Sequence, residues 1–192
     1  MPATAVVVSL LTLCKECATA ERVFTDTDMA TISILEIVED TTVDGPGFRT
    51  SVYSSGCPHH CSGCHNPQSW NIGNGRPVEI EDILKVILAD PFADVTFSGG
   101  DPMFQPAGFA KLAKAIREQS NKNIWCYTGF LFEDLLQNPA QKALLELVDV
   151  LVDGRFIEAL KDDELRFRGS SNQRIINVPA SLEKGETVVM DF

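Results

Sequence analysis

Three cysteines with a short, regular spacing are the residues of this chain best suited to chemistry. Cys57, Cys61 and Cys64 follow the pattern C-x3-C-x2-C within residues 56–67. An iron–sulfur cluster of four irons is usually held by four thiolates, and no fourth cysteine lies near enough to complete a local set. Three thiolates leave one iron without a protein ligand. Because catalytic metal sites keep an open position and structural sites close it, the spacing predicts a cluster that binds and reacts with another molecule.

A structural site that holds zinc or a closed cluster is the alternative for the same cysteines. Zinc is usually bound by two C-x2-C pairs, which together complete a tetrahedron. Cys14 and Cys17 form another such pair and are able in principle to supply extra ligands. From the cysteine spacing alone, both interpretations stay open.

A second candidate site is the run Gly-Gly-Asp-Pro at residues 99–102, which directly follows a predicted buried strand at residues 94–98. A helix is predicted over residues 104–120, because apolar residues recur there at helical spacing. The glycines thus lie at the C-terminal end of a strand, where barrel-type α/β enzymes place their active sites. Paired glycines also let a backbone approach a ligand closely. An ordinary strand–helix turn is the alternative.

Taken together, the cysteine loop and the Gly-Gly-Asp-Pro run resemble the radical S-adenosylmethionine superfamily, with its C-x3-C-x2-C signature and Gly-Gly-Glu-Pro motif. The resemblance implies a [4Fe-4S] cluster whose open iron is chelated by S-adenosylmethionine. It also implies that an electron from the cluster cleaves the sulfonium, which gives methionine and a 5′-deoxyadenosyl radical. The cofactors then carry the difficult chemistry and the protein holds them in place. Here Asp101 stands where the motif has glutamate, a shorter acid that some subfamilies use.

Four further segments resemble, in the same order, a narrower group: the activating proteins of anaerobic ribonucleoside-triphosphate reductases. The resemblance covers roughly residues 31–178, and the third and fourth segments are the most specific. It implies that the radical is passed to a C-terminal glycine loop of the reductase large subunit, and that an electron donor such as flavodoxin or ferredoxin reduces the cluster. The segments are VDGPGFR at 43–49, IWCYTG at 124–129, VDVLVDGRF at 148–156 and RGSSNQR at 168–174.

The resemblance assigns roles to individual positions. Cys57, Cys61 and Cys64 are expected to ligate the cluster. The position before the last cysteine, commonly aromatic in the wider superfamily, is a glycine here, so His65 is a candidate for the flat surface against the adenine. The residues expected to contact S-adenosylmethionine are Gly63, Cys64, His65, Gly99, Gly100 and Asp101.

Other residues near these motifs are assigned less directly. His59 and His60 are expected to cover the cluster rather than to ligate it. Asp153 ends another strand at the same face, and binding of cofactor or partner is as plausible there as a simple strand-end turn. Cys126 lies in an apolar strand and is expected to be a buried free thiol.

Composition and charge limit the classes of function. The chain has 192 residues, of which 44% are hydrophobic and 22% charged, and its formal net charge is −11. This acidity argues against direct binding to nucleic-acid phosphates, which needs a basic footprint. No apolar run approaches the roughly 18 residues of a membrane helix. The six cysteines do not resemble a secreted disulfide framework, so we expect a cytoplasmic protein without membrane or nucleic-acid partners.

Residues 1–28 lie outside the resemblance. The apolar stretch at residues 3–13 is brief and has no Lys or Arg before it, which argues against a secretory signal. We expect residues 1–28 to be a disordered or non-native extension ahead of Met29, and residues 29–192 to be the radical S-adenosylmethionine activase domain. The alternative is that Cys14 and Cys17 bind metal or pass electrons.

The elements that must position these residues alternate along the chain. Alternating strands and helices imply a mainly parallel sheet. The units are too few for eight repeats, so we expect an α/β fold with an open, partial (β/α)6-like barrel, as in the radical S-adenosylmethionine family. Residues 68–77 are expected to be a polar connection. Strands are expected at 31–38, 49–54, 95–97, 123–127, 149–152 and 174–178, with edge pairing at 187–190, and helices at 79–89, 104–120 and 132–147, the last broken by Pro139.

Activation of an anaerobic reductase is thus the leading interpretation, and alternatives stay open. One is activation of another glycyl-radical enzyme, such as pyruvate formate-lyase. The activase of that enzyme shares the run His-Asn-Pro found here at residues 65–67. A small-molecule radical enzyme, such as a deazapurine synthase, would need substrate ligands that the sequence does not reveal. The non-enzymatic alternative is a zinc or iron–sulfur interaction module.

Overall fold

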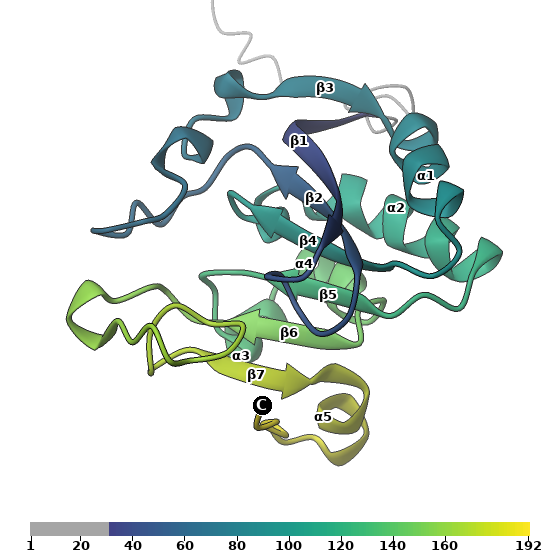
Figure 1. The fold of residues 1–192 in the computed structure, drawn as a ribbon. Coiled ribbons are helices and arrows are strands. Elements are labelled where there is room, and N and C mark those ends of the chain that lie inside the picture. Colours follow the sequence, from purple (N-terminus) through teal and green to yellow (C-terminus); the bar gives the residue numbers. More distant parts are fainter. Residues whose placement is uncertain (1–30) are drawn as a thin grey trace, which may run out of the picture.

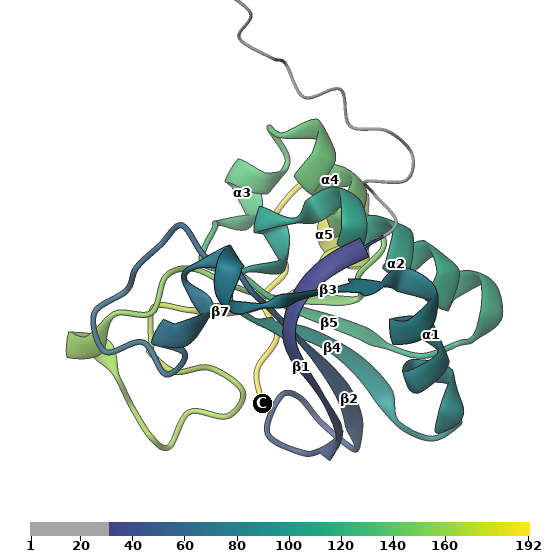
Figure 2. The same ribbon diagram turned by 90° about the horizontal axis from the view of Figure 1, so that it is seen from above.

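The computed structural model describes residues 31–192, which form one open sheet of seven strands with the helices on one of its faces (Figure 1, Figure 2). Across the sheet the strands follow the order β3-β1-β2-β4-β5-β6-β7. The strands are β1 (Thr31–Thr41), β2 (Arg49–Ser54), β3 (Arg76–Glu79), β4 (Asp94–Gly99), β5 (Ile124–Tyr127), β6 (Val150–Asp153) and β7 (Arg174–Asn177). The helices are α1 (Ile80–Ala89), α2 (Pro106–Gln119), α3 (Phe132–Leu135), α4 (Pro139–Leu145) and α5 (Val178–Lys184).

The centre of the sheet is parallel and its two sides are antiparallel. The strands β2, β4, β5 and β6 run parallel to one another, and α1, α2 and the pair α3–α4 lie on the connections that lead into β4, β5 and β6. By contrast, β1 is antiparallel to β2 and β3, and β7 is antiparallel to β6. The predicted α/β class and the parallel arrangement of the central strands are therefore confirmed.

The expected open, partial (β/α)6-like barrel is confirmed in its openness but not in its barrel-like, mainly parallel arrangement. Within residues 31–192 the sheet is open, with β3 and β7 as its outer strands, and half of its pairings are antiparallel. Parallel neighbours need a long crossover that usually contains an α-helix. The short connection at 42–48 instead makes a hairpin of β1 and β2. Residues 154–173 contain no α-helix, and they return the chain to β6 in the opposite direction.

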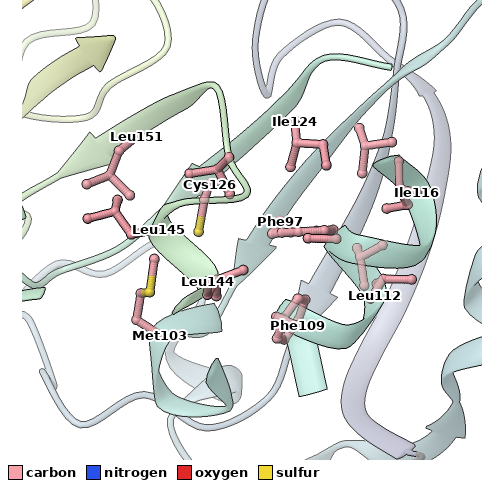
Figure 3. Close-up of a cluster of buried hydrophobic side chains, with 14 of the residues drawn as sticks. Phe97, Met103, Phe109, Leu112, Ile116, Ile124, Cys126, Leu144, Leu145 and Leu151 are labelled. Atoms are coloured by element: carbon pink, nitrogen blue, oxygen red, sulfur yellow. The ribbon is translucent and has the colours of Figure 1, made fainter. Parts of the chain in front are cut away.

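The helices form because each has one apolar face, which packs on the sheet. Figure 3 shows this core, in which Phe97 from β4 meets Phe109 from α2 with ring centroids 5.0 Å apart. Burial of each such side chain stabilises the fold by about 1.5–3 kcal/mol. The helix predicted at 79–89 is confirmed as α1, and that at 104–120 as α2 after a 3-10 turn, η3 (Pro102–Phe104). The buried positions of the two helices are Ile80, Ile83, Leu84 and Ile87, and Phe109, Leu112, Ala113 and Ile116.

One strand, β3, and one α-helix, α5, were not predicted. The expected polar connection at 68–77 holds the 3-10 turns η1 (Pro67–Ser69) and η2 (Ile72–Asn74) and runs into β3, whose Pro77 is tolerated because β3 is an outer strand. The strand expected at 174–178 ends at Asn177, whose side chain accepts a hydrogen bond from the Ala180 N–H and begins α5. The helix expected at 132–147 is divided into α3 and α4 at the predicted break. Edge pairing at 187–190 is one bridge, between Val189 and Ile176.

Some predictions fall on a part of the chain that lies outside the described residues. These are the extension at residues 1–28, the start at Met29 and the roles of Cys14 and Cys17. Within residues 31–192, no helix has the length and apolar character needed to cross a membrane.

Candidate active site

A cavity of about 560 Å³ lies at the C-terminal ends of the parallel strands. One wall is the cysteine loop (residues 55–66), and another is the return segment (residues 154–173). Figure 2 shows both projecting beyond the same end of the sheet. The structure brings together most of the residues expected at the site, since the cavity is lined by Cys57, Cys61, Cys64, His65, Gly99 and Gly100. Gly63 and Asp101 are not among its lining residues.

The three cysteines of the loop are free and half-buried. Cys126, the other cysteine in the described part of the chain, is fully buried and points into the core on the helical side of the sheet (Figure 3). In residues 31–192, no three Cys, His, Asp or Glu side chains are arranged closely enough to hold a single metal ion. The donor set of three free thiols on one loop fits a four-iron cluster with one open position.

The loop turns sharply, which places its thiols on one side. Gly56, His60 and Gly63 all have positive φ angles, of 88°, 49° and 72°. A side chain on Gly63 would place its Cβ 2.9 Å from the Glu158 carboxyl carbon. A larger residue at position 63 would therefore require the exposed Glu158 side chain to move and would be strained by the positive φ.

Burial keeps the first thiol protonated in the absence of iron. It raises the pKa of Cys57 to about 11; a backbone hydrogen bond at His59 opposes this shift, and the charge of Asp101 adds to it. Only the thiolate is a metal ligand, so binding of a metal at Cys57 must release its proton.

The paired glycines are needed for the close approach of two strand ends. A Cβ on Gly99, whose φ is +91°, would lie 2.7 Å from the backbone nitrogen of Ser54. A Cβ on Gly100 would lie 2.5 Å from the carbonyl oxygen of Gly56, at the start of the cysteine loop. The Gly100 N–H also donates to the carbonyl of Ser54 at 2.8 Å. The end of β4 is therefore in direct contact with the chain that carries the cysteines.

Gly100→Ala is expected to displace the cysteine loop. The added methyl group meets backbone atoms, which no side-chain rotation relieves, so we expect a loss of about 1–3 kcal/mol in the free energy of unfolding. Iron uptake should fall with it, as measured by urea unfolding and by iron analysis after anaerobic reconstitution. Gly73→Ala is the control, because its Cβ would meet only the end of the Asn71 side chain, at 3.2 Å. Wild-type stability and iron content in Gly100→Ala would contradict the assigned contact.

Asp101 lies behind the cavity wall. Its side chain is fully buried, and its carboxylate accepts hydrogen bonds from the Thr128 hydroxyl and from the Gly129 N–H at 2.9 and 3.0 Å. It also accepts from the Met103 N–H at 2.9 Å and from His59 Nε2 at 2.8 Å. A contact between this carboxylate and S-adenosylmethionine stays a prediction.

The three histidines of the loop have different surroundings. His65 lines the cavity, with its ring centroid 5.6 Å from that of Phe156. His60 packs against Trp70 at 4.9 Å. His59 stands between Asp101 and the ring of Phe130, whose centroid is 4.5 Å away. His59 also lines the cavity, but of the two lining histidines only His65 directly follows the last cysteine of the loop.

The return segment braces the cysteine loop from outside. Arg155 donates a hydrogen bond to the carbonyl of His59, and Glu158 accepts one from the Ser62 hydroxyl at 2.7 Å. The segment is itself held closed by Gln173, whose amide donates to the Gly154 carbonyl at 3.0 Å and accepts from the Gly169 N–H at 2.9 Å. These hydrogen bonds account structurally for the conspicuous run RGSSNQR at 168–174.

Asp44 stands on the wall contributed by the hairpin of β1 and β2. Its carboxylate accepts hydrogen bonds from the hydroxyls of Ser51 at 2.8 Å and Tyr53 at 2.5 Å. Burial, followed by the hydrogen bond to Asp44, raises the pKa of Tyr53 above its usual range. Burial, followed by the charge of Asp44, does the same for the pKa of Tyr127. Both tyrosines are therefore neutral at physiological pH.

Several cavity residues were not identified as site residues from the sequence. Most of them lie in segments whose resemblance was recognised, so the signal was present, but a linear motif does not say which of its side chains face a cavity. These residues include Asp44, Tyr53, Tyr127, Thr128, Gly129 and Phe156.

Asp153 is used inside the protein. Its buried carboxylate accepts hydrogen bonds from Arg174, at 3.0 and 2.5 Å, and from the Phe132 N–H at 2.8 Å. Arg174 also makes two hydrogen bonds to Glu133, which lower the pKa of Glu133 to about 2. Of the two roles considered for Asp153, this geometry favours support of the turn at Gly154, which lines the cavity.

Comparison with known proteins adds an independent line of evidence. A family model described as a 4Fe-4S single cluster domain matches residues 43–176. An anaerobic ribonucleoside-triphosphate reductase-activating protein from Salmonella typhimurium is 40% identical over 139 residues, which cover 68% of this chain and 89% of that protein. The protein of the same description from Escherichia coli K12 has the same identity and coverage. The one from Enterobacteria phage T4 is 32% identical over 139 residues, which cover 69% of this chain and 86% of that protein.

Proposed function

The chain belongs to the family of anaerobic ribonucleoside-triphosphate reductase-activating proteins, and from this membership we propose that it activates such a reductase as a radical S-adenosylmethionine enzyme. The single observation that best supports this proposal is the cavity in which three free thiols face the paired glycines. The relatives' names favour the anaerobic reductase over pyruvate formate-lyase as the partner, and the 4Fe-4S family match favours a cluster over zinc.

We propose that Cys57, Cys61 and Cys64 hold a [4Fe-4S] cluster and that S-adenosylmethionine binds beside it. When bound, these groups supply the one-electron chemistry that converts a glycine of the reductase into a glycyl radical. The chain's own residues shape the space, whose volume of about 560 Å³ is in the usual range for small-molecule sites. Besides the cysteines, its candidate contacts for S-adenosylmethionine are His65, Gly99 and Gly100, while Gly63 and Asp101 do not line it.

The C-terminal glycine loop of the reductase large subunit is proposed to enter the same cavity. Its rim is accessible, since Val43 lines it and is 72% exposed, and Leu165 and Phe167 add apolar surface. The neutral hydroxyls of Tyr53 and Tyr127 are candidate polar contacts for a peptide backbone. We further propose a donor such as flavodoxin or ferredoxin, and a cytoplasmic location, where free thiols persist.

The proposal is tested by one anaerobic assay. The protein is reconstituted with iron and sulfide, reduced and supplied with S-adenosylmethionine, with and without the anaerobic reductase of the same organism. We expect 5′-deoxyadenosine by chromatography and, with the reductase, the electron paramagnetic resonance signal of a glycyl radical. Deoxyadenosine without that signal would mean that the chain cleaves S-adenosylmethionine but activates a protein other than this reductase. Neither product, from protein shown to carry four irons, would overturn the enzymatic proposal.

A further inference from the structure

We infer that Asp101 is a positioning residue, which holds the cysteine loop through His59 and is not a contact for S-adenosylmethionine. The inference rests on the proposed cluster in that loop. It concerns how firmly the chain holds the cluster. It also assigns His59, rather than S-adenosylmethionine, as the partner of the acid in the Gly-Gly-Asp-Pro run.

The first argument is that the Asp101 carboxylate has no free capacity. It is fully buried and absent from the cavity wall. A carboxylate has about four lone-pair positions. Here four separate donors occupy them at 2.8–3.0 Å: the N–H groups of Met103 and Gly129, the hydroxyl of Thr128 and Nε2 of His59. A ligand ammonium group would have to displace one of these donors from a site that it reaches only through the wall.

The second argument is that the donors come from separate segments that surround the cysteine loop. Thr128 and Gly129 follow β5, while Met103 belongs to the turn η3 after β4. His59 belongs to the cysteine loop itself. The N–H of Asp101 also donates to the carbonyl of Gly56 at 2.9 Å. Asp101 therefore joins the ends of β4 and β5 to the loop at two points, one through its backbone and one through its side chain.

The third argument is the confinement of the His59 ring. It is held by Asp101 at Nε2 and by the ring of Phe130, and a Cβ on Gly129 would collide with it. On the outer side, Arg155 donates to the His59 carbonyl. His59 lies between Cys57 and Cys61, so fixing this ring and this carbonyl fixes the backbone that separates two of the three proposed ligands. Residues that orient metal ligands in this way typically change metal affinity by about 10–100-fold when they are replaced.

The geometry also fits the acid found at position 101. A glutamate would extend the carboxylate by one methylene group within a fully buried space. Its carboxylate would then lie one methylene group farther from the backbone, and so could not occupy the position in which Asp101 meets all four donors. The shorter acid is thus the one that matches this set of donors.

The test compares His59→Ala with His60→Ala in the full-length protein. His60 is a matched control, because it is the adjacent histidine of the same loop and packs on Trp70 without contacting Asp101. After anaerobic reconstitution, the rate of cluster loss to an iron chelator is followed by visible absorbance. We expect His59→Ala to lose its cluster about tenfold faster or more than wild type, and His60→Ala to stay within about twofold. His59→Gln keeps a donor near the position of Nε2 and should restore most of the retention.

A second measurement separates positioning from cofactor binding. The dissociation constant of S-adenosylmethionine is measured by equilibrium dialysis for the cluster-loaded fractions of wild type and Asp101→Asn. His59 itself lines the cavity, so His59→Ala is compared in cluster retention alone. We expect the two constants to lie within about threefold of each other, and the double variant of His59→Ala and Asp101→Asn to lose its cluster no faster than the worse single variant. If Asp101→Asn retains its cluster normally and binds S-adenosylmethionine about tenfold more weakly, Asp101 is a cofactor contact and the inference is wrong. It is also wrong if His59→Ala retains its cluster as wild type does.

The two proposals fail in different ways. A wild-type protein that takes up no four-iron cluster would overturn the proposed function and this inference with it. A wild-type protein that holds a cluster and makes deoxyadenosine, while His59→Ala keeps the same retention, would overturn the inference alone. Thermal unfolding of the cluster-free variants checks that faster cluster loss does not reflect general destabilisation.

Discussion

Replacing Cys57, Cys61 or Cys64 with serine is expected to reduce both iron content and formation of 5′-deoxyadenosine to background. Serine matches the shape of cysteine but offers a hydroxyl, which does not form the thiolate that holds an iron–sulfur cluster. The fold should survive, because the three side chains are half-buried and belong to neither core cluster. Iron analysis, visible absorbance and chromatography of the nucleoside products measure the effect, while circular dichroism reports on the fold.

Cys126→Ala is the matched control for this experiment. Its thiol is buried among apolar side chains on the helical face of the sheet, away from the cysteine loop. Its removal leaves a small cavity and is expected to cost about 1 kcal/mol of stability, with normal iron content in the protein that stays folded. If Cys126→Ala loses its cluster while one of the loop variants keeps it, the assignment of the ligands is wrong.

Replacing Arg174 with methionine is expected to give the largest loss of stability among the surface-accessible positions. Asp153 is fully buried, and without Arg174 its carboxylate keeps only the hydrogen bond from the Phe132 N–H. An uncompensated buried charge costs about 3–5 kcal/mol. For a chain of this size, each kcal/mol lowers the melting temperature by about 2–4 °C, so a fall of about 6–20 °C is expected in calorimetry.

Arg166→Met separates this effect from the general loss of an arginine. Arg166 is exposed and lies over the ring of Phe167, with its guanidinium carbon 5.8 Å from the ring centroid. Its replacement should change stability by less than about 1 kcal/mol. Equal destabilisation by the two substitutions would show that the pair of Arg174 and Asp153 is not what stabilises this end of the sheet.

Because of Arg174, the stability of the fold is expected to depend on pH in the acid range. The hydrogen bonds of this arginine lower the pKa of Glu133 to about 2 in the folded state, below the value of about 4.3 for an unfolded chain. The stabilisation that the folded state gains from ionised Glu133 is therefore fully present above about pH 4.3. It is lost as the pH falls toward 2. Glu133 is 52% exposed, so solvent screening keeps the contribution small. The slope of unfolding free energy against pH in this window should decrease in Arg174→Met.

Short sequence patterns predicted the central strands and the helices α1 and α2 of this fold well. The helices α1 and α2 follow from apolar periodicity, because each buries one clear face. The strands β2, β4, β5 and β6 were predicted instead as short segments between turns, and they are buried on both faces. The signals for α5 were also present, namely Asn177 as a cap, Pro179 in the first turn and Gly185 after the last turn. They were outweighed by the β-branched run that precedes them. The membership of the family, inferred from motifs, is confirmed by relatives of 40% identity.

What the sequence could not reveal is which groups meet in space. The strand β3 has Pro77 and no alternating pattern, and it forms because β1 offers it an outer edge. The acid at position 101 stands in a recognised motif, yet its donors Thr128 and His59 lie 27 and 42 residues away. Likewise, the direction of β7 depends on how residues 154–173 fold back, which no local periodicity encodes.

The bracing of the cysteine loop by Arg155 has a consequence for the order of events during protein synthesis. The arginine lies 96 residues after His59, whose carbonyl accepts its hydrogen bond. At translation rates of roughly 5–20 residues per second, about 5–20 s pass between the appearance of the loop and that of its brace. During that interval the thiols belong to a nascent chain whose sheet lacks β6 and β7. Iron delivered then would meet an unfinished site, so the architecture favours loading of the metal after release from the ribosome.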